Sequence, residues 1–429
     1  MRVQLGGPAP AAPGVTQSPS TVLTPKGAKR PYLERLVINV THDCNLRCTY
    51  CYADTGAYGE ARHKLTAGVG EEIVETFFSR FTEIRTIQLF GGEPFLNLAG
   101  IDGLCRHVAK VAEREGAPMP RFTTVSNGTL VNDAVIDLIN THGILVTVSL
   151  DGDKKLNDAQ RIYAHGGGSY DRVVANIRRL KAATGQPAQI EGTYTAAHLE
   201  ADFSLAEFMR FIARDLGVRF LHMPWILGEA YGGTGVAPTD ANIERLIEVY
   251  SEAISASFAS LETQDLGDTI LLSSVDTALR GELSPAQDRR THICPAGSGT
   301  LSVGADGRVF PCFMFTNKSP FEFTRVGAGF DDAVFDARRA DFVGQLEIPE
   351  DGNVGGFEMR AACAGHNYDV GGRIDHVSAA GLRVQDAIDA HMRRELSALR
   401  ADEDRWNWVR CKLMLHQLES ATPFEAPAC

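Results

Sequence analysis

Residues 41–52 read THDCNLRCTYCY and carry three cysteines, Cys44, Cys48 and Cys51, in the spacing C-x3-C-x2-C. An apolar run that predicts a strand comes directly before them, so a single loop can wrap one metal centre. Thiolate sulfur is the usual ligand of a [4Fe-4S] cube, which takes four ligands when it only transfers electrons. Three local cysteines leave one iron open, which is what a reagent needs in order to bind and be reduced there.

Two other interpretations fit the same loop. A zinc ion could use His42 or His63 as its fourth ligand, or the cysteines could be structural. The other motifs in the chain favour the iron–sulfur interpretation over both.

Short β-branched or apolar runs alternate with amphipathic segments from Leu36 onward, which predicts repeated βα units. Six strands are expected, and the helical patterns between them would cover a parallel sheet. Two of these patterns are Ile73, Phe77, Phe81, Ile84 and Val173, Ile177, Leu180. The expected strands are residues 36–41, 86–90, 121–125, 145–150, 189–195 and 219–225.

Glycine-rich or polar motifs follow the second, third and fourth expected strands, and in a parallel barrel functional groups cluster at the carboxyl ends of strands. Gly91-Gly92-Glu93-Pro94 lacks side chains that would keep a ligand from the backbone, and it offers a carboxylate. Ser126-Asn127-Gly128 and Ser149-Leu150-Asp151-Gly152 end the next two strands, and Arg161 follows. Each is an ordinary turn by itself, but together and in this order they indicate a ligand site.

The triad, with the aromatic Tyr50 before its last cysteine, resembles the cluster motif of the radical S-adenosylmethionine (SAM) superfamily. The resemblance implies that SAM occupies the open iron of a [4Fe-4S] cluster. An electron from the reduced cluster then cleaves SAM, and the 5′-deoxyadenosyl radical abstracts hydrogen from the substrate, while the protein positions and shields the chemistry. It also implies a partial (β/α)6 barrel of the α/β class, TIM-like, followed by a smaller α+β domain.

The resemblance assigns SAM contacts to the strand-end motifs. Residues 91–94 resemble the GGEP motif that binds the SAM ammonium, and 149–152 resemble the S-x-D-G turn of peptide-modifying members. The implied contacts are Gly91, Gly92, Glu93, Pro94, Ser126, Asn127, Ser149, Asp151, Arg161 and Tyr50.

Cys294 and Cys312 form a C-x12-G-x4-C pattern, and Cys363 lies downstream. The pattern resembles the opening of the auxiliary-cluster modules called SPASM and twitch domains. A full SPASM domain has seven cysteines, so one auxiliary [4Fe-4S] cluster is expected here rather than two. His366 is the first candidate for its fourth ligand, because it stands where a C-x2-C pair would place a thiolate. Cys411, Cys429, a substrate atom or no ligand are the other options, and a degenerate module with zinc or no metal is the alternative.

The whole chain of 429 residues divides on composition into five parts. We expect a flexible leader at 1–33, the radical SAM partial barrel at 34–238, a helical connection at 239–290, the SPASM/twitch-like domain at 291–376 and a helical tail at 377–429. Cys105 and Cys411 lie in helical runs and are expected to be buried core residues.

The formal net charge of −12 argues against nucleic acid or an anionic membrane as the main partner. The N-terminus has no continuous apolar run, so neither a signal peptide nor a membrane span is expected, and the protein is interpreted as cytoplasmic. Nine cysteines, an odd number, favour metal ligation over a disulfide framework.

Residues 51–59, CYADTGAYG, resemble the segment after the triad in maturases of ribosomally made peptides. The resemblance implies a peptide substrate that receives a crosslink or other modification, and a reductant such as flavodoxin or ferredoxin. Residues 1–33 are too short for a leader-peptide-binding domain. We therefore expect either a separate protein that brings the peptide or direct binding at the barrel mouth and second module.

A small-molecule dehydrogenase and a non-catalytic iron–sulfur or zinc protein are the alternative functions. The sequence names no general base. Glu191 and Tyr194 on the fifth strand are both able to reach the cavity, depending on a register that the sequence leaves open, and His222 receives no role.

Overall fold

The computed structural model describes residue 30 and residues 32–226, 239–265, 268–283, 291–348, 353–354, 357–358, 363–375 and 377–419. The expected leader therefore lies almost wholly outside the described residues, as does the proposed ligand Cys429.

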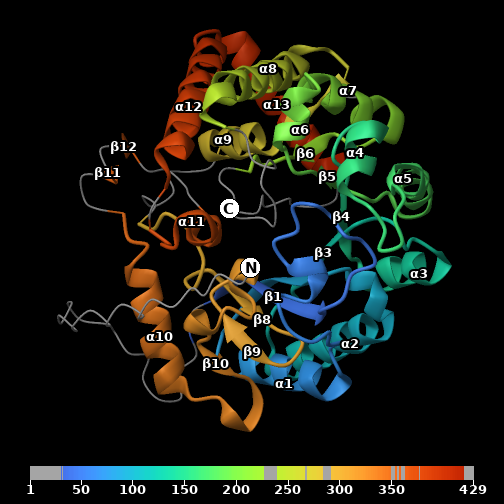
Figure 1. Ribbon diagram of the computed structural model, residues 1–429, viewed down its shortest axis with the longest axis vertical. Helices are drawn as coiled ribbons and strands as arrows, with labels where there is room; N and C mark the ends of the chain where they lie inside the picture. The colour runs from blue at the N-terminus through green and yellow to red at the C-terminus, as the bar shows by residue number, and fades with distance from the viewer. Residues whose placement is uncertain are drawn as a thin grey trace, which may run out of the picture.

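One ten-stranded sheet organises the described chain, in the order β10-β9-β8-β1-β2-β3-β4-β5-β6-β7 (Figure 1). The strands are β1 Leu33–Thr41, β2 Ile84–Gly91, β3 Arg121–Ser126, β4 Leu145–Ser149, β5 Gln189–Glu191, β6 Phe220–His222, β7 Leu271–Leu272, β8 Thr300–Val303, β9 Arg308–Phe310 and β10 Thr324–Arg325. The first six run parallel in chain order. The other neighbour of β1 is β8, so the six strands form a partial barrel that stays open, as predicted.

Helices between the strands cover the outer face of this sheet (Figure 1). They are α1 Ala67–Phe78, α2 Leu98–Glu115, α3 Asp133–His142, α4 Lys154–Gln160, α5 Tyr170–Thr184, α6 Ala196–Glu200 and α7 Leu205–Leu216. Thr66, Asn132 and Ser204 cap α1, α3 and α7 by accepting backbone N–H groups of the first turn. Left-handed glycines end several of them, because glycine adopts positive φ without strain. These C-caps are Gly116, Gly143, Gly185 and Gly217.

Alternation along β2 shows how the core is divided. Ile87 and Leu89 are fully buried beneath the helices, whereas Gln88 and Phe90 face the barrel interior and are partly accessible. Each buried aliphatic side chain of this kind contributes about 1.5–3 kcal/mol of stability. The outer face is therefore the apolar core, and the inner face is left for polar groups.

The C-terminal half adds two layers. α8 Ile243–Glu262, α9 Ser273–Leu283, α12 Ala379–Arg400 and α13 Glu403–Glu419 gather at one end, where α12 and α13 pack on α8 (Figure 1). At the other end lie β8–β10 and α10 Asp332–Gly344, while α11 Ala364–Gly371 lies between the two (Figure 1). The short elements are β11 Asn353–Val354, β12 Phe357–Glu358, and the 3-10 helices η1 Asp54–Gly56, η2 Pro94–Asn97, η3 Asp240–Asn242, η5 Phe313–Phe315, η6 Ser319–Phe321 and η7 Gly327–Gly329.

The six predicted strands are all present, but β5 and β6 are shorter than expected. Beyond Glu191 and His222 the two segments pair only through a bridge between Tyr194 and Trp225. The segment 239–290, expected to be helical, also contributes β7, which extends the sheet beside β6.

Two expectations about side chains were wrong. Ile73 and Phe77 belong to α1, but Phe81 follows the helix end at Phe78 and Ile84 opens β2, although all four are buried. Cys105 is buried as expected, whereas Cys411 is exposed.

Cys411 is exposed because α13 turns its other face inward. Val409, Lys412 and Leu413 are its buried residues, and their spacing of three and four places Cys411 on the outer side. Among the described residues, no helix combines the length and apolar character needed to cross a bilayer.

Candidate functional site

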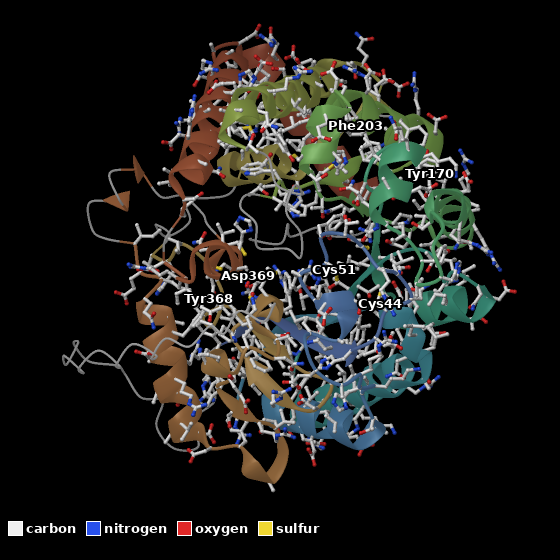
Figure 2. All side chains as sticks on the ribbon, in the orientation of Figure 1. Cys44, Cys51, Tyr170, Phe203, Tyr368 and Asp369 are labelled. Carbon is white, nitrogen blue, oxygen red and sulfur yellow. The ribbon has the colours of Figure 1, made fainter. Side chains whose placement is uncertain are left out.

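The triad lies on the loop after β1, at the carboxyl edge of the sheet, and Figure 2 shows Cys44 and Cys51 near the middle of the molecule. The Arg47 guanidinium donates to the carbonyls of Cys44 and Leu46, both at 2.7 Å. The backbone N–H groups of Arg47 and Thr49 donate to Ile162 and Gln160, at 2.7 and 3.0 Å. The loop is therefore hydrogen-bonded both to itself and to the end of α4 and the residues that follow it.

Gly91 and Gly92 bring the end of β2 against the base of this loop. The N–H of Gly92 donates to Thr41 O at 3.1 Å, and that of Glu93 donates to Asp43 O at 2.8 Å. A Cβ on Gly91, whose φ is +132°, would lie 2.1 Å from Thr41 O, and one on Gly92 would lie 2.3 Å from Asp43 O. The described contact of the two glycines is thus with the chain's own backbone, a reason for glycine that the sequence interpretation did not include.

Glu93 is fully buried beside this contact, and Pro94 opens η2 next to it. The Glu93 carboxylate accepts hydrogen bonds from the N–H of Phe95 at 3.1 Å, the hydroxyl of Ser126 at 2.9 Å and the N–H of Asn127 at 2.7 Å. Burial raises the pKa of Glu93 to about 6, and these hydrogen bonds oppose the rise. A carboxylate has about four acceptor positions, so one is left for a ligand donor.

The side chain of Asn127 links the end of β3 to the triad loop. Its side-chain Nδ2 donates to Asn45 Oδ1 at 2.8 Å and lies 3.7 Å from Cys44 Sγ. Thr129 donates to Asn127 Oδ1 at 2.7 Å and accepts from Asn45 Nδ2 at 2.8 Å. The sequence interpretation missed Asn45 and Thr129. Their position next to Cys44 and to the Ser126-Asn127-Gly128 motif was the available signal.

Tyr50 links the triad loop to the residues that follow β4. Its hydroxyl donates to the buried carboxylate of Asp151, and Arg161 donates to that hydroxyl at 2.5 Å. Arg161 and Asp151 are also an ion pair at 3.6 Å. Asp151 accepts from the N–H of Thr193 at 3.1 Å, which links the loop to the segment after β5. The structure thus brings these three predicted residues together as one network.

Ser149 ends β4 and is 8% exposed. It pairs in register with Glu191, and Glu191 pairs with His222. Tyr194 instead packs in the core with no exposed surface and donates to Phe203 O. The register that the sequence left open therefore puts Glu191, not Tyr194, on the interior face of the barrel.

The triad suits an iron–sulfur cube by its donor set. Burial raises the pKa of the Cys44 thiol to about 12 and that of Cys48 to about 11, so a bound cation is needed to hold either as thiolate. Among the described residues, no three His, Cys, Asp or Glu side chains are placed to hold a single metal ion.

The zinc interpretation is further weakened at its fourth ligand. His42 is fully buried, burial lowers its pKa to about 4, and its Nε2 accepts from the N–H of Ala305 at 3.2 Å. A neutral imidazole that accepts at Nε2 carries its proton on Nδ1, so neither nitrogen is open to a metal. His63 is exposed.

The second group of cysteines gathers around the β9 end. Cys312 is the residue before η5, two positions after the end of β9, and Cys363 is the residue before α11, which packs on η5. The turn after Cys294 is tied to the same place, because the N–H of Gly297 donates to Pro311 O at 3.0 Å. His366 lies one turn into α11, and burial lowers its pKa. The three cysteines thus come from segments that contact one another.

The two cysteine sites face each other through aromatic residues. Tyr52 follows Cys51, and its ring centroid lies 6.2 Å from that of Phe313, which follows Cys312. Phe90, at the end of β2, lies 4.8 Å from the same Phe313 ring.

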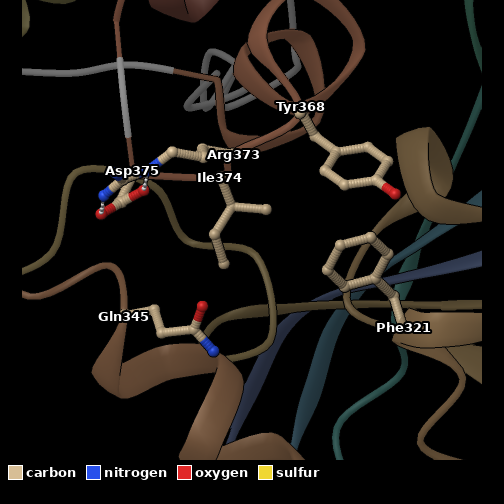
Figure 3. A pocket seen from close by; sticks show the side chains of 7 residues that line it. Phe321, Gln345, Tyr368, Arg373, Ile374 and Asp375 are labelled. Atoms are coloured by element: carbon tan, nitrogen blue, oxygen red, sulfur yellow. Dashed lines mark hydrogen bonds and ion pairs between the residues drawn. The ribbon is translucent and has the colours of Figure 1, made fainter. Parts of the chain in front are cut away.

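A surface pocket of about 220 Å³ lies farther out on the C-terminal module (Figure 3). It is lined by Phe321, Gln345, Tyr368, Gly372, Arg373, Ile374 and Asp375. Its charged side chains, Arg373 and Asp375, pair with each other at 2.8 Å. With its charges already matched, this pocket is a weaker candidate than the triad edge.

Comparison with known proteins identifies the class. Residues 38–212 match the model of the Radical SAM superfamily. This part of the chain is therefore similar to radical SAM domains, as the triad and the strand-end motifs predicted. A [4Fe-4S] cluster and SAM are the cofactors of this family.

Among named relatives, a cysteine-type anaerobic sulfatase-maturating enzyme of Clostridium novyi is 30% identical over 34% of this chain and 40% of its own length. A GTP 3′,8-cyclase of Peptoclostridium acidaminophilum is 30% identical over 49% of this chain and 60% of its own. AlbA of Bacillus subtilis, a subtilosin biosynthesis protein, is 22% identical, and the match covers 75% of this chain and 62% of AlbA. The chain thus spans less than two thirds of each of these relatives.

The fold is shared with solved structures. The native anSMEcpe structure with bound AdoMet has a TM-score of 0.66 at 17% identity, covering 89% of this chain and 100% of that one. Streptococcus suis SuiB bound to S-adenosylmethionine has a TM-score of 0.54 at 15% identity, covering 83% and 79%. The common fold therefore extends past the barrel into the C-terminal module.

Proposed function

We propose that this protein modifies a peptide by abstracting a hydrogen atom from it, so that a crosslink or another modification forms. When bound, the [4Fe-4S] cluster and SAM supply the radical for that abstraction. The chain's own part is to hold both groups at the carboxyl edge of the sheet and to keep water from them.

The proposal gives each predicted site residue a role. Cys44, Cys48 and Cys51 would ligate the SAM cluster. Glu93 has one acceptor position left after its three internal hydrogen bonds, which suits the SAM ammonium. Asn127 supports Cys44. The remaining proposed SAM contacts are Gly91, Gly92, Pro94, Ser126, Ser149, Asp151, Arg161 and Tyr50. The hydrogen bonds of Gly92 to the triad loop, of Ser126 to Glu93 and of Tyr50 to Asp151 support this assignment.

The similarity to maturases supports the proposal that the substrate is a peptide. The relative from Clostridium novyi matures sulfatases by its name, and AlbA acts in the biosynthesis of a bacteriocin. The match to AlbA covers 75% of this chain, which is more than the radical SAM domain alone.

An auxiliary cluster at Cys294, Cys312 and Cys363 is part of the proposal. The converging segments around η5 support it, and His366 is the proposed fourth ligand because it lies one turn after Cys363 on α11. Phe313 and Tyr52 would separate this cluster from the triad. The electron donor would be a flavodoxin or ferredoxin.

A small-molecule substrate is the second candidate function. The GTP 3′,8-cyclase relative favours it, because its match at 30% identity covers 49% of this chain. The neighbouring DNA discriminates the two: a short open reading frame beside the gene favours a peptide, and small-molecule pathway genes favour the alternative.

Anaerobic reconstitution tests the enzyme itself. We expect the holoenzyme to cleave SAM to 5′-deoxyadenosine, Cys48→Ala to abolish this, and Cys105→Ala, a buried cysteine away from both sites, to retain it. Iron analysis should give about eight irons per chain with two cubes and about four with one. A reconstituted cluster that never cleaves SAM would rule out the proposed function.

A further inference from the structure

We propose that Glu191 binds a nitrogen-donor group of the substrate, an ammonium, guanidinium or carboxamide, at the mouth of the barrel between β4 and β6. The inference rests on the proposed function, because it names the chemistry of the substrate for the same site.

Register places three polar residues side by side at this mouth. Ser149 pairs with Glu191 and Glu191 with His222, and each is the last residue of its strand. Adjacent strands lie about 4.8 Å apart, so the three side chains form one short row (strands β4, β5 and β6 in Figure 1). Ile190 and Leu221, one residue earlier, are fully buried beneath the helices, so the row faces inward.

The Glu191 carboxylate has no donor from any described residue. The charged groups nearest to it, Arg161 and Asp151, are already bound to each other and to Tyr50. The Nδ1 of His222 lies 2.8 Å from the Ser273 hydroxyl, so that nitrogen is engaged as well. Glu191 is partly buried, and a carboxylate in such a place gains from any ligand that brings N–H donors, because hydrogen bonds to a charged acceptor are among the strong ones.

Gln189 is the independent observation that a polar ligand belongs here. It lies two residues before Glu191, on the same face of β5, and is only 2% exposed. Its Oε1 is buried without a hydrogen-bond partner among the described residues. Buried polar side-chain atoms are nearly always hydrogen-bonded, so the open Oε1 of Gln189 indicates a missing donor on the face of β5 that also carries Glu191.

The charge of the row selects the ligand. An ionised carboxylate accepts and repels anions, whereas an ammonium, guanidinium or amide group supplies two or more donors. The position also suits the reaction, because Asp151 accepts from Thr193, two residues after Glu191, and from Tyr50 in the triad loop. A group held at Glu191 therefore lies on the same edge of the sheet as the cysteines.

Binding of three blocked pentapeptides to the reconstituted holoenzyme with SAM tests the proposal. The peptides are Ac-Gly-Gly-X-Gly-Gly-NH2 with X as lysine, norleucine or glutamate, and titration calorimetry gives each Kd. We expect the lysine peptide to bind about tenfold tighter than the norleucine peptide, as a hydrogen bond to a charged group predicts. The glutamate peptide should bind most weakly.

Variants assign this preference to Glu191. Glu191→Leu should bring the lysine and norleucine peptides to equal affinity, and Glu191→Gln should reduce the preference for lysine. Glu200→Gln, which removes an exposed carboxylate on α6, is the matched control and should keep it. Equal binding of the lysine and norleucine peptides by the wild type overturns the proposal without any variant, and so does a preference that survives Glu191→Leu.

A competition arm with n-butylammonium separates the two sources of an amine. Weak competition supports a peptide side chain, and competition equal to that of the lysine peptide supports a small amine at the same carboxylate. SAM cleavage by the wild type is measured in parallel. Its absence would overturn the proposed function, whereas a missing lysine preference in an enzyme that cleaves SAM overturns only the present inference.

Discussion

The backbone N–H of Asn127 donates a hydrogen bond of 2.7 Å to the Glu93 carboxylate, and this contact joins the ends of β2 and β3 beneath the triad. The side chain of Asn127 continues to Asn45 and to Cys44 Sγ. Under the proposed function, Glu93 would therefore support the cluster ligand Cys44 through the chain itself as well as contact SAM.

Glu93→Gln should weaken the site without changing its shape. The glutamine amide would face at least one of the three N–H or O–H donors that now point at the carboxylate, so we expect a loss of about 1–3 kcal/mol of stability. Iron retention after anaerobic desalting should fall as well. Glu113→Gln, on the exposed face of α2, should change neither quantity. Iron retention equal to wild type in Glu93→Gln would contradict the supporting role.

Gly92→Ala should disrupt the triad loop. The added methyl group would meet the carbonyl of Asp43 at 2.3 Å, and because that atom is backbone, the loop must move. We expect the reconstituted iron content to drop to less than about half. Gly103→Ala is the matched change, since a Cβ there meets open space within α2, and it should stabilise the protein by about 0.5–1 kcal/mol. Equal iron content in both variants would show that the close approach is not required.

The raised pKa of Glu191 predicts that the stability of the protein depends on pH. Burial raises its pKa to about 7, with Arg161 opposing and Asp151 adding to the shift. Between its usual value of 4.5 and about 7 the folded state holds more protons than the unfolded state, so this residue's contribution to stability falls as the pH rises. Its folded carboxylate is fully charged only above this window.

Glu191→Gln should therefore be more stable than the wild type at pH 8, on the order of 1–2 kcal/mol after allowance for its partial accessibility, and similar to it at pH 4.5. Thermal unfolding of both proteins at the two pH values measures the difference. His222, the neighbour in register, is present in both proteins, so the comparison isolates the change at Glu191. If Glu191→Gln gained more stability over the wild type at pH 4.5 than at pH 8, the prediction would be contradicted.

We expect Lys412 to stabilise the fold at the end of α8, outside the candidate site. Its side chain is 1% exposed, and Nζ donates to the carbonyls of Ser260, Thr263 and Asp265 at 2.9–3.0 Å. These carbonyls lie in the last turn of α8 and just beyond it, so Lys412 caps that helix. Lys412→Met should cost about 2–3 kcal/mol, seen as a lower thermal midpoint, whereas Lys110→Met on the exposed face of α2 should cost almost nothing.

Local sequence determined much of this protein. The alternation of β-branched runs and amphipathic segments is a property of neighbouring residues, and it located six strands and the helices between them. The triad and the motifs after β2, β3 and β4 are also local, since a loop of eight residues carries all three thiols. The family assignment followed from these segments.

Tertiary structure alone decided how these motifs contact one another. The pairing of β1 with β8, the docking of Gly91 and Gly92 on the triad loop, and the network of Tyr50, Asp151 and Arg161 join residues tens to hundreds of positions apart. The choice between Glu191 and Tyr194 depended on register, and a shift of one residue turns every side chain to the other face. Register is set by the neighbouring strands β4 and β6, so no pattern within β5 could decide it.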